Sequence, residues 1–450
     1  MAYVEKMYTE GEFQDEIVKL VIANGWKKVK SFFRAVYPDM EQKSDDDTKF
    51  EFGMSKHMLV KNNSGSIYGI AQISKWSLKK SEIKYNFTNE EGKKAFAEDG
   101  KKRLESGRDR SCFYVYMIEK EPSVADEGIL VLPYESNKFE KILLDVELTK
   151  ITVTTKVSPG GGGSTYKIYS YDEAETQVMM SPWVKVTLRN TNLQGINAQT
   201  NWWPDSLVRI DGQVDESRVV LLIQADNTPA FENNVVPVTP LYMGQLESYA
   251  NDDTLGDALW AGTAFDTGNE EASHKFDFND TKPYRNVENY MPVMKSYPRS
   301  PGNGIDNVII KRSRLGARYQ AHFIAWNVAP NAMPPDRVGK DGGQYSLAWQ
   351  SQDNDEYKYQ FNPSVYSNKV HTSRAYIVHP DEGVRGYLPY MILLSPLGLL
   401  NGDRLKVRKN TCPDSHDIYK FFNVDAISPI TKRPATAYRP AGLGIFEKTV

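Results

Sequence analysis

The sequence predicts a mainly β protein, made of antiparallel sandwiches or barrel-like sheets, with a small α+β region at the amino terminus. Three observations lead to this prediction. Helical periodicity appears only in the first quarter of the chain, whereas alternating or β-branched segments recur through the rest. Long polar connections rich in Asn, Asp, Gly and Pro separate these segments, as the turns and loops between strands do.

The first expected helix begins near residue 13. Its apolar stripe consists of four residues at helical spacing: Phe13, Ile17, Leu20 and Val21. Gly25 is expected to end the helix, because glycine readily adopts the left-handed conformation that closes helices. Trp26 is then expected to pack beyond that end.

A second helix is expected over residues 89–106. Asn89 can cap its first turn, which carries acidic residues, while basic residues near its end complement the helix dipole. The apolar face is thin and consists of Ala95, Phe96 and Leu104. We therefore expect this helix to lie on the surface.

Most of the remaining segments are predicted strands. Residues 143–148 and 151–155 favour strands, and a glycine-rich tip at 159–163 joins the latter to 166–169 in a hairpin. A second hairpin is expected from 207–210 and 219–223, with a turn at Asp211-Gly212. Further strands are expected at 112–118, 184–188, 319–326, 357–361, 375–378 and 404–407.

Three domains are expected from these patterns. An amino-terminal α+β domain covers residues 1–140, a β-rich domain with long aromatic loops covers 141–312, and a carboxyl-terminal β domain covers 313–450. The stretch after Pro434 is too rich in Pro and Gly for a helix. We expect it to run as an extended strap over its own domain or a neighbour.

Composition narrows the class of protein. The 450 residues include 55 Lys+Arg and 58 Asp+Glu, a net charge of −3, which argues against binding nucleic acid through bulk positive charge. Residues 1–6 lack a secretion signal, and the apolar stretch 387–400 is short and interrupted by proline, so no membrane insertion is expected. Cys112 and Cys412 lie far apart in the sequence, which fits folding in a reducing cytoplasm.

Catalytic and cofactor motifs are not recognisable. Ser55-Lys56 is a possible nucleophile and base, but adjacent strand residues point to opposite faces. The six histidines lack zinc-ligand spacing, the acidic clusters lack the calcium-loop pattern, and the glycine-rich tip lacks the Gly-Lys-Ser/Thr of a phosphate loop. We therefore expect no enzyme activity, cofactor or metal. A carboxylate pair for polysaccharide hydrolysis stays an open alternative, because its geometry is three-dimensional.

Aromatic residues in the long polar connections are the candidate binding residues: Trp202, Trp203, Tyr284, Tyr290 and Tyr297. Ordered loops of this length are uncommon in a self-contained domain, and aromatic side chains are preferred anchors of protein interfaces. Packing against neighbouring subunits is one interpretation. Stacking on sugars is a second, and packing within ornate surface loops is a third.

Two segments carry a resemblance to a known group of proteins. The first runs from Ser217 to Asp226, continues through Pro240-Leu241-Tyr242-Met243-Gly244 and ends near Ala264. The second runs from Asn423 to Pro429 and from Tyr438 to Ile445. Together with the opening helix closed by Gly25-Trp26, they resemble virion structural proteins of tailed bacteriophages, usually placed in the tail or baseplate.

This resemblance implies a structural subunit without an enzymatic site. Its partners would be copies of itself and other virion proteins, with no nucleic acid, and it would be made and assembled in the host cytoplasm before residing in the virion. The near-zero net charge suits close self-association, because repulsion between copies is small. A receptor- or carbohydrate-binding tail module that contacts a host surface glycan is the first alternative, and a cell-wall or polysaccharide hydrolase is the second.

Overall fold

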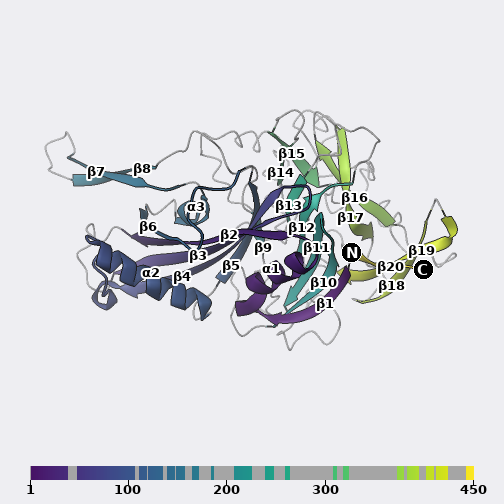
Figure 1. Ribbon diagram of the computed structural model, residues 1–450, viewed down its shortest axis with the longest axis horizontal. Helices are drawn as coiled ribbons and strands as arrows, with labels where there is room; N and C mark the ends of the chain where they lie inside the picture. Colours follow the sequence, from purple (N-terminus) through teal and green to yellow (C-terminus); the bar gives the residue numbers. More distant parts are fainter. Residues whose placement is uncertain are drawn as a thin grey trace, which may run out of the picture.

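The computed structural model confirms a mainly β protein built of several sheets, most of them antiparallel (Figure 1). Each described sheet has two free ends, so these sheets are open and not closed into barrels. The structure describes residues 2–38, 48–106, 111–118, 120–134, 139–146, 148–157, 165–171, 184–186, 207–225, 239–247, 259–263, 308–311, 318–323, 372–379, 383–394, 402–409, 412–423 and 442–450.

A six-stranded sheet forms the amino-terminal half of the fold. Its strands, in spatial order, are β6 (Ile129–Tyr134), β2 (Lys27–Pro38), β3 (Lys49–Lys61), β4 (Ile67–Lys79), β5 (Ser111–Ile118) and β9 (Val184–Val186). All neighbours are antiparallel except β2 and β6, which are parallel. The middle strands are buried over most of their length because helices cover both faces of the sheet.

The helix α1 (Phe13–Ala23) follows a short 3-10 turn, η1 (Glu10–Glu12), and has the predicted apolar stripe buried. Gly25 adopts φ +99°, the left-handed conformation expected after the helix. Trp26 is buried, and its Nε1 donates to the carbonyl of Asp215 at 2.7 Å. The indole therefore ties the end of α1 to a distant part of the chain.

A second 3-10 turn, η2 (Lys80–Glu82), precedes α2 (Glu90–Glu105), whose Asn89 cap accepts from the Gly92 N–H at 2.8 Å. The helix α2 is more buried than the sequence predicted. Ala95 is exposed, but Phe96 is fully buried and packs with Phe52 and Trp76 of the sheet. The helix therefore closes one apolar core of the protein.

The prediction of a strand at residues 143–148 is wrong. Residues up to Leu144 form the short helix α3 (Phe139–Leu144), which packs on the face of the sheet opposite α2. Gly53 makes room for it, since a Cβ there would lie 2.5 Å from Cζ of Phe139. Because residues four apart lie on the same face of a helix, the close approach of α3 to the sheet buries Phe139 and Leu143 together.

A five-stranded antiparallel sheet joins the amino terminus to the middle of the chain. Its strands, in spatial order, are β1 (Ala2–Thr9), β10 (Leu207–Val214), β11 (Arg218–Ala225), β12 (Thr239–Gln245) and β13 (Leu259–Thr263). The predicted turn at Asp211-Gly212 is wrong, because both residues lie inside β10. The turn falls at Asp215, whose Oδ1 accepts from the N–H groups of Ser217 and Arg218 at 2.7 and 2.8 Å.

A seven-stranded sheet contains the carboxyl terminus. Its strands, in spatial order, are β14 (Val308–Lys311), β15 (Arg318–Phe323), β16 (Thr372–His379), β17 (Gly383–Leu394), β20 (Gly442–Thr449), β19 (Cys412–Asn423) and β18 (Arg404–Lys409). The carboxyl terminus is extended, as expected, but β20 is an interior strand instead of a strap over a domain.

The predicted glycine-tipped hairpin is confirmed as a separate two-stranded ribbon of β7 (Ile151–Val157) and β8 (Thr165–Tyr171). The predicted strands at 112–118, 375–378 and 404–407 are also present, as are parts of those at 184–188 and 319–326. The prediction at 357–361 lies outside the described residues. Pairing of β1 with β10 and of β5 with β9 crosses position 140, while the three domain limits remain a prediction.

Candidate functional site

The five aromatic residues predicted from the sequence to form an interface, Trp202, Trp203, Tyr284, Tyr290 and Tyr297, lie outside the described residues. So do the interiors of the loops that carry them. The candidate sites below are therefore built from other residues. Three places bear on function: a buried polar cluster, a charged junction between sheets and an exposed ribbon.

The Ser55-Lys56 pair does not act as a unit. Ser55 is buried on the face of β3 covered by α3, whereas the Nζ of Lys56 lies on the opposite face, 2.7 Å from Oδ1 of Asp15 in α1. Strand alternation separates the two side chains, as predicted. A Ser-Lys nucleophile is therefore not assembled here.

Ser55 instead joins a fully buried cluster with His57 and Tyr116. The Nδ1 of His57 lies 2.8 Å from the Tyr116 hydroxyl, and its Nε2 lies 3.1 Å from Oγ of Ser55 and 2.9 Å from the carbonyl of Leu143. The imidazole also stacks on Phe32 with the ring centroids 4.7 Å apart. The sequence did not reveal this cluster, because its members come from two strands and α3.

The hydrogen bonds of the cluster determine its chemistry. A carbonyl only accepts, so the contact with Leu143 assigns the proton of His57 to Nε2, and Nδ1 then accepts from Tyr116. Ser55 donates to the same carbonyl at 2.7 Å. Nε2 is therefore not available as a base for Ser55, and a Ser-His nucleophile is not formed.

Burial controls the protonation of this cluster. Burial, together with the positive charge of Arg34, lowers the pKa of His57 to about 3. Burial also lowers the pKa of Arg34 to about 10. The Nη1 of Arg34 donates to the Leu148 carbonyl, so His57 bonds a carbonyl within α3 and Arg34 bonds one just beyond its end. The cluster and Arg34 therefore hold α3 and the residues just after it against the sheet.

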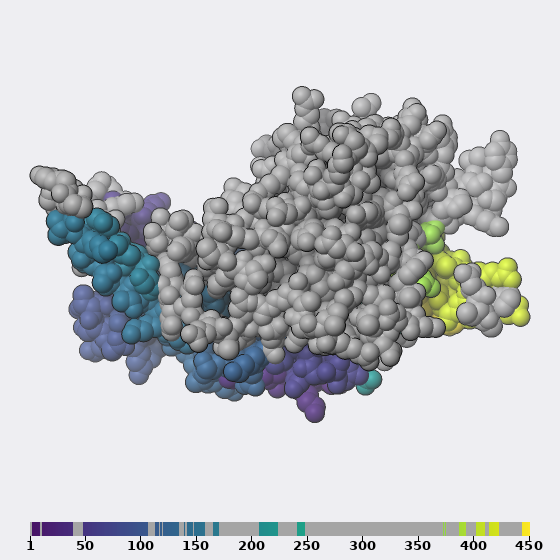
Figure 2. All heavy atoms as spheres, turned by 90° about the horizontal axis from the view of Figure 1, so that it is seen from above, coloured from purple at the N-terminus to yellow at the C-terminus, as the bar shows by residue number. Residues whose placement is uncertain are grey.

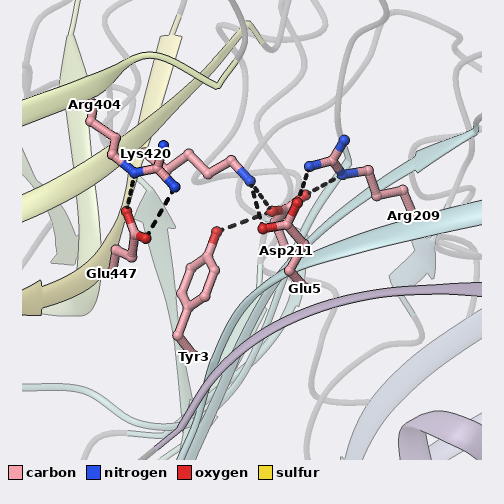
Figure 3. Close-up of polar contacts among 7 residues, drawn as sticks. All are labelled: Tyr3, Glu5, Arg209, Asp211, Arg404, Lys420 and Glu447. Carbon is pink, nitrogen blue, oxygen red and sulfur yellow. Dashed lines mark hydrogen bonds and ion pairs between the residues drawn. The ribbon is translucent and has the colours of Figure 1, made fainter.

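A charged junction joins the five-stranded and seven-stranded sheets (Figure 3). Lys420 of β19 extends toward β10, where its Nζ lies 2.7 Å from Oδ1 of Asp211 and 3.1 Å from Glu5. Asp211 also accepts from the Tyr3 hydroxyl at 3.0 Å and from Nε of Arg209 at 2.9 Å. Burial, with the negative charge of Asp211, raises the pKa of Tyr3, so the phenol stays protonated and donates.

Further contacts extend this junction along the sheets. The Gln213 side chain donates to the Phe446 carbonyl at 2.7 Å, and the Tyr390 hydroxyl donates to Asp215 at 2.7 Å. The rim pair of Arg404 with Glu447, at 2.7 Å, is partly exposed. The junction therefore links the first and last strands of the chain through buried polar contacts, which is a structural role.

Among the described residues, the β7–β8 ribbon is a strongly exposed element. Figures 1 and 2 show it at the end of the molecule opposite the carboxyl-terminal strands, drawn in blue-green. After Ile151, every residue of β7 is exposed, with Val153 at 39% and Val157 at 63%. Tyr166 of β8 is 44% exposed. An isolated two-stranded ribbon is only marginally stable in water, so such a surface is typical of one that a partner covers.

Metal sites and membrane-spanning helices were also sought among the described residues. Within the described ranges, no group of three or more His, Cys, Asp and Glu side chains is arranged to hold a metal ion. No helix described there has the length and apolar character that crossing a membrane requires.

The described parts of the segments that carry the sequence resemblance contribute to one core. The stripe of α1 and Trp26 pack with Val220 and Leu222 of β11 and with Tyr242 of β12. Leu443 of β20 belongs to the same core. No protein-family model matches the sequence, and a search of curated proteins found no significant match.

Proposed function

We propose that the protein is a non-enzymatic structural subunit of a tailed-phage virion, most consistent with the tail or baseplate, and that it acts through assembly contacts. The observation that carries this proposal is the β7–β8 ribbon, which leaves Val153, Val157 and Tyr166 exposed at one end of the molecule. Exposed β-branched and aromatic side chains on a two-stranded ribbon favour a role in binding another protein chain.

The shared core supports the phage assignment. Three segments that resemble phage virion proteins have described residues in it, namely the opening helix, strands β11 and β12 of residues 217–264, and residues 442–445 of β20. Segments so far apart in the sequence resemble one group of proteins and also pack together. That is the pattern expected if the resemblance reflects a shared fold unit.

The buried polar groups also suit a structural part. His57 and Ser55 are fully buried and bonded to the Leu143 carbonyl, and Lys420 is paired with Asp211. These residue types often serve in catalysis. Here, each of these groups holds one element of the fold against another. In this proposal the partners are copies of the same chain and other virion proteins, and the protein resides in the virion.

The experiment compares purified particles made with the wild-type protein and with a Val153→Asp, Val157→Asp variant. We expect the wild-type chain in stoichiometric amounts in the particles by mass spectrometry, and placed by electron microscopy in the tail or baseplate. The variant should keep its thermal unfolding temperature, because both side chains are exposed, yet should be depleted from particles by about tenfold or more.

A Thr152→Asp, Thr154→Asp variant is the matched control, because it adds the same charge to the other face of the same strand. Absence of the wild-type protein from purified particles would overturn the proposed function. Equal incorporation of the two aspartate variants and the wild type would show that the ribbon does not mediate assembly.

A further inference from the structure

The strand β6 has an open edge. It is the outermost strand of its sheet and pairs only with β2. The Phe33 N–H donates to the Gly128 carbonyl at 2.8 Å, and Phe33 lies opposite Ile129 in the parallel register. By the alternation of a parallel ladder, the N–H and C=O groups of Ile129 and Val131 point away from β2. Among the described residues, these four groups have no main-chain partner.

This open edge faces a groove with a volume of about 630 Å³. Ala97 and Lys94 of α2 line one side of the groove, and Ile151 and Val153 of β7 line the other. The six residues of β6 span about 20 Å, which is the length of a short strand. An extended segment beside β6 would thus find main-chain partners on one side and apolar side chains on both flanks.

The charge around the groove selects among occupants. The charged residues that line the groove are three lysines and two glutamates: Lys93, Lys94, Lys150, Glu90 and Glu98. On α2, Glu90 is paired with Lys93 at 2.7 Å, whereas Lys94 has no ion pair with another described residue, and Glu98 adds one negative charge. The excess of positive charge favours an acidic occupant and disfavours the lysine-bearing ribbon of a second copy.

We propose that the groove between α2, β6 and β7 accepts an extended acidic segment of a partner protein as an added strand. The partner's main chain bonds Ile129 and Val131, its β-branched side chains pack against Val153, and its carboxylates pair with Lys94 and Lys150. This is strand addition at a sheet edge, in which main-chain bonds supply affinity and side chains supply selectivity. This proposal extends the proposed assembly role. It rests on that role in one respect, namely that the acidic segment comes from a neighbouring virion protein.

The test measures binding of a labelled, end-blocked hexapeptide of alternating valine and glutamate to the full-length protein by fluorescence anisotropy. A second probe carries lysine in place of glutamate, and a third carries N-methyl groups on alternate main-chain nitrogens. We expect saturable binding of the glutamate probe. Binding of the other two should be about tenfold or more weaker, because one loses charge complementarity and the other loses strand hydrogen bonds.

Two protein variants locate the site. Val131→Pro removes a single outward N–H and leaves the β2–β6 hydrogen bonds in place, while Val131→Ala keeps that N–H. We expect the proline variant to weaken binding by about tenfold and the alanine variant to stay within about twofold. Lys150→Glu should weaken the glutamate probe and strengthen the lysine probe. Lys406→Glu, on exposed β18, should change neither.

No saturable binding of the glutamate probe at millimolar concentration would overturn the inference. So would equal binding by wild type, Val131→Pro and Lys150→Glu proteins. The proposed function is tested separately by the presence of the chain in particles. If the chain is present in particles but does not bind the probe, the proposed function would stand and only the inference about the groove would be overturned.

Discussion

Lys420 and Asp211 form a buried ion pair between distant parts of the chain, with 2.7 Å between Nζ and Oδ1 and side chains only 6% and 3% exposed. Their strands, β19 and β10, belong to different sheets. The Tyr3 hydroxyl and Nε of Arg209 also donate to the Asp211 carboxylate. The pair therefore couples the position of the carboxyl-terminal sheet to that of the amino-terminal strand.

Replacing Lys420 by methionine should destabilise the protein. Asp211 would keep Arg209 and Tyr3 but lose its nearest cation, and a buried charge without its partner is costly. We expect the free energy of unfolding to fall by about 2–3 kcal/mol, measured by urea unfolding. Arg404→Met is the control, because the Arg404 side chain is 57% exposed and its pair with Glu447 should contribute less than about 1 kcal/mol. Equal effects of the two substitutions would contradict the special role of the buried pair.

The stability of the protein should fall in mildly acidic solution because of His57. Its pKa is lowered from 6.5 to about 3 by burial, so the unfolded chain takes up a proton between these values and the folded chain does not. This linkage removes about 1.4 kcal/mol of unfolding free energy per pH unit below 6.5, or about 2 kcal/mol by pH 5.

The measurement compares urea unfolding of wild type and His57→Gln at pH 7.5 and pH 5. Glutamine does not titrate, so the variant should lose less stability than the wild type over this interval, although it starts from a lower value. An identical loss in both proteins would show that His57 is not the group responsible.

Gly69 should be intolerant of any side chain. It lies opposite Tyr116 in the β4–β5 register, and a Cβ there would lie 2.0 Å from the Tyr116 ring. Gly69→Ala should displace the ring and break its contact with His57, at a cost of about 2–3 kcal/mol in unfolding free energy. In a Tyr116→Ala background the same substitution should cost much less, because the obstructing ring is gone. Additive effects of the two substitutions would refute this explanation.

The turn between β10 and β11 should depend on Asp215. Its carboxylate accepts from two main-chain N–H groups and from the Tyr390 hydroxyl. Burial opposes its ionisation, but the hydrogen bonds from Tyr390 and Ser217 outweigh burial and lower the pKa of Asp215. Its contribution is therefore present at neutral pH and is lost as the pH falls through the lowered pKa.

Asp215→Ala should lower the unfolding free energy by about 1–3 kcal/mol at pH 7, by thermal or urea unfolding. Asp215→Asn keeps an oxygen acceptor for the turn and should retain more than half of that stability. A loss for asparagine as large as that for alanine would indicate that the negative charge, and not the acceptor oxygen in the turn, is what matters.

Local features of the fold were predictable because they depend on neighbours in the sequence. The stripe from Phe13 to Val21, the left-handed Gly25 and the Asn89 cap each act within one or two helical turns. The β7–β8 ribbon was predictable for the same reason, since a glycine-rich tip joins two β-prone segments. Each wrong prediction concerned a segment whose conformation depends on a distant partner.

Residues 139–144 illustrate the difference. Leu143 and Leu144 fit a strand by composition, but the space above Gly53 accommodates a helix that buries Phe139 and Leu143 together. Asp211-Gly212 has the composition of a turn, yet Asp211 is held inside β10 by Lys420, a residue 209 positions away. Turn propensity was outweighed by a buried charge pair that local sequence does not show.

The sequence by itself determined that this is a mainly β chain with two amino-terminal helices and a glycine-tipped ribbon. Periodicity and turn chemistry act over short separations, so they can be read along the chain. Only the tertiary structure placed His57 against Leu143, Lys420 against Asp211 and the edge of β6 beside α2. Those contacts depend on which strands become neighbours, and that choice follows from burying the whole set of apolar faces at once.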